Sequence, residues 1–312
     1  MKTALLSLPH GSLGGNRTTA LRWAKVLREL GWHVALASKG MQAEAELLIA
    51  LHAAHTRAEV EELLRAHPAA KLVVACTGTD LYEAREESQA LLERAHRVIV
   101  LQERMLDELT ESQRERARVI YQSAPTLAEA PPPPKDHLRL ALIASVRPVK
   151  DPLLAVRAVQ ALPESSKVQL LHLGEAIDDE LSEQLERESE SCARYEWRGR
   201  SSRLEALRLI ASSHAVVLPS KSEGGASLIT EALAAGTPVL ASDAPGNVGV
   251  LGDAHPGLFP RGDTAALTAL LARIETDGGF LERLRERSAQ LAWIASPDRE
   301  RAAWRELLAE LA

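Results

Sequence analysis

Residues 214–242 read HAVVLPSKSEGGASLITEALAAGTPVLAS: a β-rich apolar run, a glycine turn, an Ala-rich helix and a second apolar run. Apolar runs without polar alternation are typical of strands that are buried on both faces of a parallel sheet. A strand, a helix and another strand in this order favour a βαβ unit. The stretch therefore predicts a parallel α/β sheet, in which ligands bind at turns beyond the carboxyl ends of the strands.

The same alternation extends outward over nearly the whole chain. Helical patterns separate most of the predicted strands, which are TALLSL (3–8), WHVALAS (32–38), ELLIAL (46–51), KLVVACTG (71–78), RVIVLQ (97–102), ARVIYQ (117–122), RLALIAS (139–145) and VQLLHLG (168–174). Four successive prolines at 131–134 interrupt the pattern and favour a stiff extended spacer. We therefore expect two Rossmann-like domains at 1–130 and 138–296, a proline-rich linker at 131–137, and a closing helix at 297–312 that packs back on the first domain.

The bulk properties narrow the functional classes. The chain has 312 residues and a formal net charge of −6, which gives no sign of a nucleic-acid or anionic-membrane surface. No apolar run is long enough for a membrane span, and the first residues make a poor signal peptide. Two cysteines, Cys76 and Cys192, are too few to indicate a disulfide framework or a metal site. A cytoplasmic location is the simplest expectation.

The glycine turn of the opening stretch carries two acids eight positions apart, Glu223 and Glu231. If the helix starts close to Gly225, its free N–H groups face the ligand edge, where they bind phosphate or sugar oxygens. Eight helical residues rise about 12 Å and return to nearly the same face, a span comparable with that from the sugar to the ribose of a sugar nucleotide. Glu231 would otherwise be an expensive buried acid among Ala, Leu and Ile.

Two other turns of the second half carry cations. Arg147 and Lys150 precede a helix that starts with Asp151 and Pro152, and they would neutralise a leaving diphosphate. Ordinary solvated surface charges are an equally good interpretation of this segment alone. Arg198 and Gly199 lie on a further turn of the same edge, where a planar base can lie.

The first turn of the chain, PHGSLGGNRTTALRW (9–23), has features of an anion site. Gly14 and Gly15 allow close approach of a ligand, Asn16 is a good N-cap, and Arg17 opposes the positive end of the helix dipole. These features together make sense if an anion binds there. A surface arginine beside an ordinary glycine turn is the alternative.

Two weaker candidates close strands of the first half. In CTGTDLY (76–82), the polar groups of Thr77, Gly78, Thr79 and Asp80 can hydrogen-bond a ligand, although Thr79 or Asp80 can equally well cap the following helix. Gln122 and Ser123 end the last strand of this half in the same way.

These residues resemble the GT-B glycosyltransferases whose donor helix carries the motif E-x7-E, here Glu223 to Glu231. The resemblance covers nearly the whole chain and implies two Rossmann-like domains that face each other across a cleft. It also implies a sugar-nucleotide donor, with Arg147 and Lys150 on the diphosphate and Glu231 on the ribose. Donor-binding residues implied in this way are Arg147, Lys150, Arg198, Gly199, Ser222, Glu223, Gly224, Gly225, Ala226 and Glu231.

Several local patterns are similar to the selenosugar synthases of selenoneine biosynthesis: GGNRTTALRWAKVLRELGWHV, TGTDLY, VIYQSA, SEGGASLITEALAAGTPVLAS and PGNVGVLG. That family joins selenophosphate to the sugar of a UDP-sugar such as UDP-N-acetylglucosamine, forms a carbon–selenium bond and releases UDP. Other enzymes of selenium metabolism would then be possible partners. The acceptor-binding residues implied are Gly14, Gly15, Asn16, Arg17, Thr77, Gly78, Thr79, Asp80, Gln122 and Ser123.

One departure from ordinary GT-B relatives fits such an acceptor. Many relatives carry a histidine in the turn where Thr77 stands here. An alcohol acceptor gains from a positioned base, whereas selenophosphate is already anionic and needs a phosphate clamp instead. We therefore expect Arg17, Arg147, Lys150 and Glu223 to carry catalysis. With no Asp-x-Asp motif, we expect no metal or other cofactor.

Three alternatives remain open on the sequence: an ordinary GT-B glycosyltransferase with an alcohol or other small-molecule acceptor, a UDP-sugar epimerase, and a binding module without catalysis. The Arg147, Lys150, Glu223 and Glu231 set argues against the last of these.

Overall fold

The computed structural model describes residues 2–9, 14–37, 44–127 and 129–312. The chain forms two compact units, residues 1–122 with 297–312 and residues 123–296. The division falls after Gln122, whereas the sequence placed the end of the first domain at residue 130. Ala124 explains part of this difference, because its N–H donates to the carbonyl of Ala295 at 3.1 Å and ties the two ends of the second unit together.

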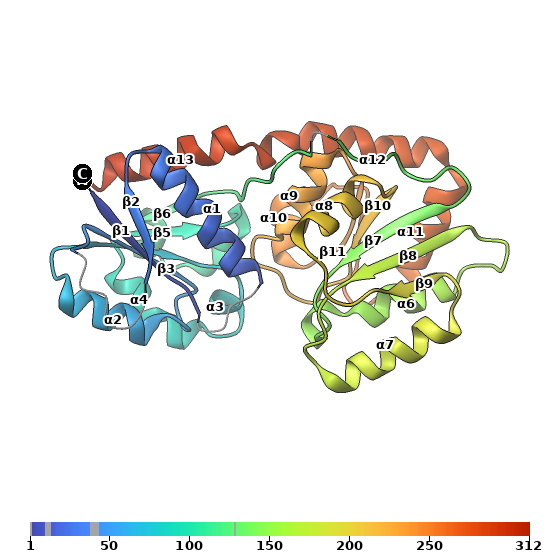
Figure 1. Ribbon diagram of the computed structural model, residues 1–312, viewed down its shortest axis with the longest axis horizontal. Helices are drawn as coiled ribbons and strands as arrows, with labels where there is room; N and C mark the ends of the chain where they lie inside the picture. Colours follow the sequence, from blue (N-terminus) through green and yellow to red (C-terminus); the bar gives the residue numbers. More distant parts are fainter. Residues whose placement is uncertain (1, 10–13, 38–43, 128) are drawn as a thin grey trace. The chain divides into compact units, whose positions relative to one another are not determined.

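The first unit is a parallel sheet with the strand order β2-β1-β3-β4-β5-β6 (Figure 1). Its strands are β1 (Thr3–Ser7), β2 (His33–Leu36), β3 (Leu47–Leu51), β4 (Lys71–Ala75), β5 (Arg97–Val100) and β6 (Ala117–Val119). Its helices are α1 (Gly15–Glu29), α2 (Arg57–Ala66), α3 (Thr79–Tyr82), α4 (Arg85–Arg94), η1 (Glu103–Glu108), α5 (Glu111–Glu115) and α13 (Pro297–Glu310). Strand β2 lies on one side of β1, and β3 to β6 lie on the other side. The strand order therefore reverses between β1 and β3, which is the switch point of this sheet.

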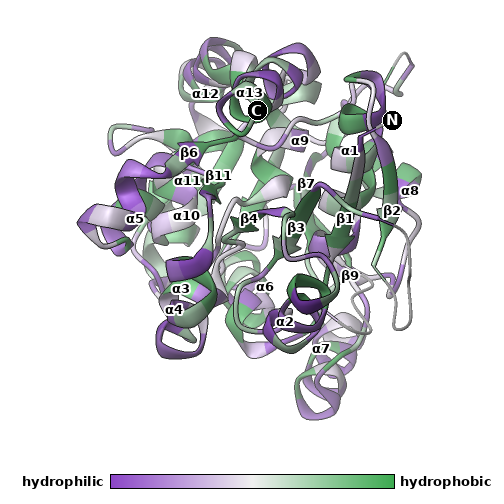
Figure 2. Cartoon of the chain, turned by 90° about the vertical axis from the view of Figure 1, so that its left-hand side faces the viewer, coloured by the Kyte–Doolittle hydropathy of each residue, from purple (hydrophilic) through white to green (hydrophobic). Residues whose placement is uncertain are grey.

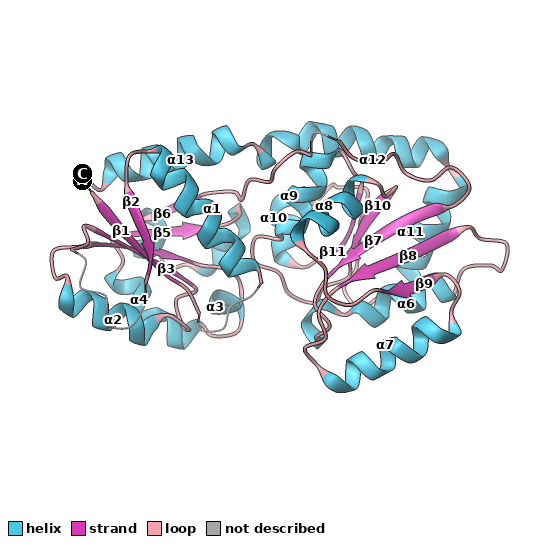
Figure 3. Ribbon diagram, viewed as in Figure 1, coloured by secondary structure: helices cyan, strands magenta, loops and turns pink. Residues whose placement is uncertain are grey.

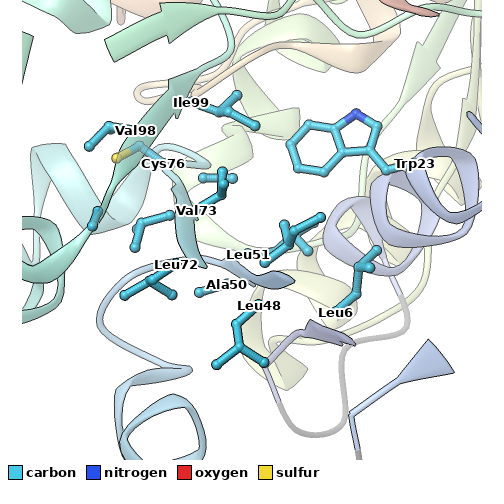
Figure 4. Packing of buried hydrophobic residues seen from close by; sticks show 14 of the residues in the cluster. Leu6, Trp23, Leu48, Ala50, Leu51, Leu72, Val73, Cys76, Val98 and Ile99 are labelled. Carbon is cyan, nitrogen blue, oxygen red and sulfur yellow. The ribbon is translucent and has the colours of Figure 1, made fainter. Parts of the chain in front are cut away.

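The core of the first unit consists of the apolar runs that the sequence predicted as strands. Figure 4 shows Leu48 and Leu51 of β3 close to Leu72 and Val73 of β4, all of them buried. Trp23 of α1 belongs to the same core. Burial on both faces explains why these strands lack polar alternation.

Helix α13 joins the first unit through α1. The rings of Trp23 and Trp304 meet edge to face with centroids 5.0 Å apart. Glu300 is buried and accepts from Trp23 Nε1 at 2.8 Å and from Arg22 Nε at 3.0 Å. A buried carboxylate with an arginine and an indole partner is satisfied, so this contact stabilises the closing helix on α1.

The second unit is also a parallel sheet, with the order β12-β11-β10-β7-β8-β9. Its strands are β7 (Leu138–Ile143), β8 (Val168–Leu173), β9 (Tyr195–Trp197), β10 (Ala215–Leu218), β11 (Val239–Ser242) and β12 (Leu258–Phe259). Its helices are η2 (Pro148–Lys150), α6 (Pro152–Gln160), α7 (Asp179–Ser191), α8 (Arg203–Ala211), α9 (Ser227–Ala235), α10 (Pro245–Leu251), α11 (Thr264–Thr276), α12 (Gly278–Leu291) and η3 (Ala292–Ala295). Here the switch point lies between β7 and β10.

Helices follow most strands in both units, as Figure 3 shows in cyan and magenta. In Figure 2 strands such as β3 and β4 are green, whereas exposed helices such as α2 and α7 carry purple, hydrophilic residues. The predicted α/β class with parallel sheets is therefore confirmed. The described helices include none that is long and apolar enough to cross a lipid bilayer.

Candidate functional site

The second sheet has a small pocket at its switch point, where β7 and β10 end side by side. Its volume is about 80 Å³. The residues that line it are Leu142, Ile143, Ala144, Lys150, Val217, Leu218, Pro219, Ser220, Glu223, Ala226, Ser227 and Leu228. Parallel α/β sheets bind ligands at this position, and the pocket contains both a cation and a carboxylate.

Lys150 and Glu223 form an ion pair inside this pocket, with Nζ 2.5 Å from Oε1. The side chains are only 19% and 12% exposed, so the pair is partly withdrawn from water. Ser220 Oγ donates to the same carboxylate oxygen at 2.7 Å. An anionic ligand would therefore compete with Glu223 for Lys150, and its binding would release a carboxylate that can accept from hydroxyl groups.

The loop that carries Glu223 is held by residues that the sequence analysis did not single out. Ser242 Oγ donates to the carbonyl of Ser220 at 2.5 Å, and Asn247 Nδ2 donates to Ser242 at 3.1 Å. A Cβ added at Gly246 would lie 2.0 Å from the carbonyl oxygen of Glu223. Ser242 ends the quoted pattern SEGGASLITEALAAGTPVLAS, and Gly246 and Asn247 belong to the quoted pattern PGNVGVLG. These patterns were the only signal of the three residues in the sequence, and the packing now gives Gly246 a steric reason.

Helix α9 begins at Ser227, with Ala226 as its N-cap in the left-handed region at φ 38°. No side chain in the described part of the chain caps this end, so the first N–H groups of α9 lie uncapped beside the pocket that Ser227 and Leu228 line. Glu223 precedes the helix by four residues, and the expected 12 Å helical rise from Glu223 to Glu231 is therefore wrong. Gly224 and Gly225 are buried in the loop before α9 instead of opening the helix, and the carbonyl of Gly224 packs against Gly246 of α10.

Glu231 lies within α9, and its side chain is 13% exposed. Arg203, the first residue of α8, lies 3.1 Å from its carboxylate. The cost of burying this acid is therefore offset by an arginine that the sequence analysis missed. An ion pair between two helices cannot be predicted from the sequence of either helix alone.

The remaining donor-side residues are more exposed. Arg147 is exposed and Ser222 is half-buried. Arg198 pairs with Glu196, Nε to Oε1 at 2.7 Å, and this contact lowers the pKa of Glu196. Gly199 adopts φ 69°, a left-handed conformation that favours glycine.

Arg198 also lines a larger pocket of about 470 Å³ beside α8. Its other lining residues are Arg139, Leu171, Leu173, Arg200, Ser201, Glu205, Arg208, Leu209 and Ser212. The smaller pocket is the better candidate for chemistry, because only it combines the switch point with the Lys150–Glu223 pair.

In the first unit, α1 begins at Gly15 with Gly14 at its N-cap, and none of the described side chains caps it. Asn16 therefore lies inside the helix, and its predicted role as N-cap is wrong. Arg17 is exposed in the first turn. A Cβ at Gly14 or Gly15 would meet nothing within 4 Å among the described residues, and both glycines are exposed.

The turn after β4 is organised by Asp80. Its fully buried carboxylate accepts from the N–H groups of Thr77 at 2.9 Å, Gly78 at 2.8 Å and Ala53 at 3.1 Å. Asp80 is therefore occupied by the backbone and is not exposed to a ligand. Gly78 allows the turn with φ 132°, and Thr77 and Thr79 stay half-buried.

Two histidines join this turn without having been predicted. His52 follows β3 directly, and its Nε2 lies 2.8 Å from Thr79 Oγ1. The rings of His52 and His55 stack with centroids 3.9 Å apart. Burial lowers the pKa of His52, so its ring is neutral at pH 7.

Gln122 and Ser123 are buried, 6% and 5% exposed. Among the described residues Gln122 Oε1 finds no hydrogen-bond partner. Within the same part of the chain, no group of three or more His, Cys, Asp or Glu residues is arranged to hold a metal ion.

Comparison with solved structures places this architecture among the GT-B glycosyltransferases. The chain is similar to HepE of Anabaena, solved with UDP and glucose, with a TM-score of 0.75, 15% identity, and coverage of 99% of this chain and 100% of HepE. For a sucrose-phosphate synthase of Thermosynechococcus elongatus the TM-score is 0.79 at 19% identity, with 99% and 100% covered. For the pneumococcal O-GlcNAc transferase GtfA, solved with UDP and GlcNAc, it is 0.67 at 17% identity, with 85% and 56% covered.

No curated protein matches the chain in sequence. The family model described as "Glycosyl transferases group 1" matches residues 123–291, which is more than half of the chain. This segment contains β7 to β12, the switch-point pocket and the Lys150–Glu223 pair. The chain therefore belongs to the group 1 glycosyl transferases.

Proposed function

We propose that this protein transfers the sugar of a UDP-sugar, UDP-N-acetylglucosamine, to selenophosphate, forms a carbon–selenium bond and releases UDP and phosphate. The observation that carries the donor side is the partly buried Lys150–Glu223 pair in the switch-point pocket. Two similar structures, HepE and GtfA, were solved with UDP. The selenium acceptor rests on the local sequence patterns at 14–34, 77–82, 119–124, 222–242 and 245–252.

In this proposal the second unit binds the donor. Lys150, the exposed Arg147 and the open N–H groups of α9 neutralise the diphosphate as negative charge develops on it. Glu223, released from Lys150, accepts from the sugar hydroxyls beside Ser222, Gly224, Gly225 and Ala226. Glu231, oriented by Arg203, accepts from the ribose, and Arg198 with Gly199 borders the base.

The first unit binds the acceptor. Gly14, Gly15, Asn16 and Arg17 supply open N–H groups and a positive charge for an oxyanion. Thr77, Gly78 and Thr79, held in place by Asp80, with Gln122 and Ser123, complete the acceptor side. No metal takes part in the proposed reaction.

The chemistry balances as a displacement followed by a hydrolysis. A selenium lone pair forms the bond to the anomeric carbon while the bond from that carbon to the β-phosphate oxygen breaks, and its electron pair leaves with UDP. Water then adds to phosphorus, the phosphorus–selenium bond breaks, and phosphate departs from the selenol of the sugar. Selenium is a soft nucleophile that is already anionic, so the first step needs charge neutralisation more than a base.

Incubation of the protein with UDP-N-acetylglucosamine and selenophosphate tests the proposal. We expect UDP release that depends on selenophosphate, and a product whose mass contains selenium and one N-acetylhexosamine. Release that requires an added alcohol and ignores selenophosphate would show an ordinary glycosyltransferase. An isomeric UDP-sugar formed from the donor alone would show an epimerase.

A further inference from the structure

The carboxyl edge of the first sheet has its own switch point, between β1 and β3. His52 lies at this point, directly after Leu51, the last residue of β3. It is 3% exposed and adopts φ 78°, one of three described residues other than glycine with positive φ. A left-handed histidine costs on the order of 1 kcal/mol or more, and such strain is retained mostly where surrounding contacts enforce it at functional sites.

The contacts around His52 define its tautomer. The backbone N–H of His55 can only donate, and it points at His52 Nδ1 at 3.2 Å. Nδ1 therefore accepts, and the ring proton of neutral His52 lies on Nε2. His52 Nε2–H then donates to Thr79 Oγ1 at 2.8 Å. The other tautomer would set the N–H of Nδ1 against the N–H of His55.

The hydroxyl group of Thr79 is consequently oriented to donate its own hydrogen bond to a group other than His52. Its oxygen accepts from His52, so its own proton is free to donate elsewhere, and the side chain is half-buried instead of enclosed. The backbone donors next to it are already engaged, because Asp80 accepts from Thr77 and Gly78. Asp80 also accepts from Ala53, so one carboxylate fixes the ends of β3 and β4 relative to each other.

We propose that His52 and Thr79 form a donor relay in which Thr79 Oγ1 hydrogen-bonds an anionic oxygen of the acceptor, the phosphoryl oxygen of selenophosphate, and His52 is the positioning residue. This inference rests on the proposed function for the identity of the acceptor. A hydroxyl that accepts from an imidazole N–H is a stronger donor, because successive hydrogen bonds polarise one another. Nε2 carries a proton and cannot act as a base, so the relay suits an acceptor that arrives as an anion.

The variants Thr79→Val and Thr79→Ser test the relay by steady-state kinetics. Valine keeps the shape of threonine and removes the hydroxyl, whereas serine keeps the hydroxyl. We expect Thr79→Val to raise KM for selenophosphate roughly tenfold or more, the effect of one hydrogen bond to a charged group, with KM for UDP-N-acetylglucosamine within about twofold of wild type. Thr79→Ser should restore the acceptor KM. An unchanged acceptor KM in Thr79→Val would overturn the relay.

His52→Gln and His52→Leu test the positioning role, because glutamine retains a donor and an acceptor and leucine retains neither. We expect glutamine to keep most of the acceptor affinity and leucine to lose as much as Thr79→Val. Equal losses in both variants, accompanied by a higher KM for UDP-N-acetylglucosamine, would indicate a purely structural histidine and overturn its assignment.

Binding of inorganic phosphate separates this inference from the proposed function. Titration calorimetry on wild type and Thr79→Val needs no turnover, so it decides the relay even if selenophosphate proves not to be the acceptor. We expect phosphate to bind wild type roughly tenfold more tightly than Thr79→Val. Equal dissociation constants, or no binding to wild type, would contradict the relay. Absence of UDP release with selenophosphate in wild type contradicts only the proposed function.

Discussion

Gly246 shows how one residue on a neighbouring helix affects where a charged side chain lies. The space that a Cβ would occupy there is taken by the backbone carbonyl oxygens of Glu223 and Gly224, at 2.0 and 2.5 Å. Because these are backbone atoms, they cannot move aside for an added Cβ as the end of a flexible side chain can. The close contact brings the Glu223 loop against α10 and so supports the pairing of Glu223 with Lys150.

We predict that Gly246→Ala displaces the Glu223 loop and lowers kcat/KM for UDP-sugar at least tenfold, since a shift of about 1 Å at a reacting group can cost that much or more. The overpacking should also lower the free energy of unfolding by about 1–3 kcal/mol. Steady-state kinetics and urea unfolding measure the two effects.

Gly278→Ala is the matched control for this substitution. Gly278 opens α12 in the same unit, and an added Cβ would meet nothing within 4 Å among the described atoms. Wild-type kinetics in Gly278→Ala are therefore expected. If Gly246→Ala also retained wild-type kinetics, the close packing of the Glu223 loop would have no part in activity.

At the scale of elements, the amino end of α9 and the lysine of η2 place positive charge around the switch-point pocket. Helix α9 has no side-chain cap, and Lys150 ends η2. Partial charges at a helix terminus and a full charge on lysine both favour a developing diphosphate. In the proposed mechanism these protein groups supply the neutralisation that a divalent cation supplies in other phosphate sites.

We therefore predict that a chelator such as EDTA leaves the rate of UDP release unchanged within about twofold, because Lys150, Arg147 and the α9 N–H groups supply the positive charge. The measurement compares protein dialysed against EDTA with protein supplied with Mg²⁺ or Mn²⁺. Loss of the rate on dialysis and its recovery with a metal would contradict the metal-free mechanism.

A second prediction at this scale concerns His172, which links β8 to β7 and β9. Its Nε2 donates to the carbonyl of Ala144 at 2.8 Å, and its Nδ1 accepts from Tyr195 Oη at 2.9 Å. Burial lowers the pKa of His172 from 6.5 to about 4. The unfolded chain therefore binds a proton first as the pH falls, and stability that is complete above pH 6.5 declines between pH 6.5 and 4, by about 2 kcal/mol from pH 7 to 5.

Urea unfolding at pH 7 and pH 5, followed by circular dichroism, measures this loss. His255 also has a pKa of about 4 and adds a loss of its own, so wild type alone does not isolate His172. His172→Gln keeps a donor and an acceptor but does not titrate, and we expect its loss to be smaller by about 2 kcal/mol. An identical loss in both proteins would exclude His172 as a source of the pH dependence.

At the scale of the whole molecule, the two units carry different chemistry. The second unit holds the paired charges Lys150–Glu223 and Arg203–Glu231. The first unit holds an exposed arginine at the open amino end of α1 and the hydroxyl relay at its own switch point. Each set of residues comes from one sheet edge, so substitutions in one unit should affect one substrate.

We predict that Arg17→Ala raises KM for selenophosphate roughly tenfold and leaves UDP binding within about twofold, because only the acceptor meets this charge. Lys150→Ala should weaken UDP binding by a similar factor and spare the acceptor. Initial rates over a grid of both substrates, together with UDP titration, measure the split. Equal effects on both substrates in both variants would contradict the assignment of donor and acceptor to separate units.

Much of the fold could be predicted because each central strand is a recognisable apolar run in the sequence. The runs at β1, β3, β4, β5, β7, β8, β10 and β11 are apolar on both faces, and helices with their own period separate them. The edge strands β9 and β12 have three and two residues and went unrecognised, since neither belongs to a longer apolar run as the equally short β6 does. The start of α9 was also misplaced, because Gly224 and Gly225 resemble a helix opening until the packing of Glu223 and Gly224 against Gly246 is known.

For the candidate site, the sequence by itself determined the types of residue, the turns that carry them and their order along the chain, because strand-to-helix turns are local. Only the tertiary structure decided which of them meet. Lys150 and Glu223 are 73 positions apart, and the ion pair joins turns after β7 and β10, which become neighbours only when the sheet assembles out of chain order. Two further contacts depend on the folding of distant segments, that of Arg203 with Glu231 and that of His52 with Thr79. In neither pair can the sequence around one residue predict the other.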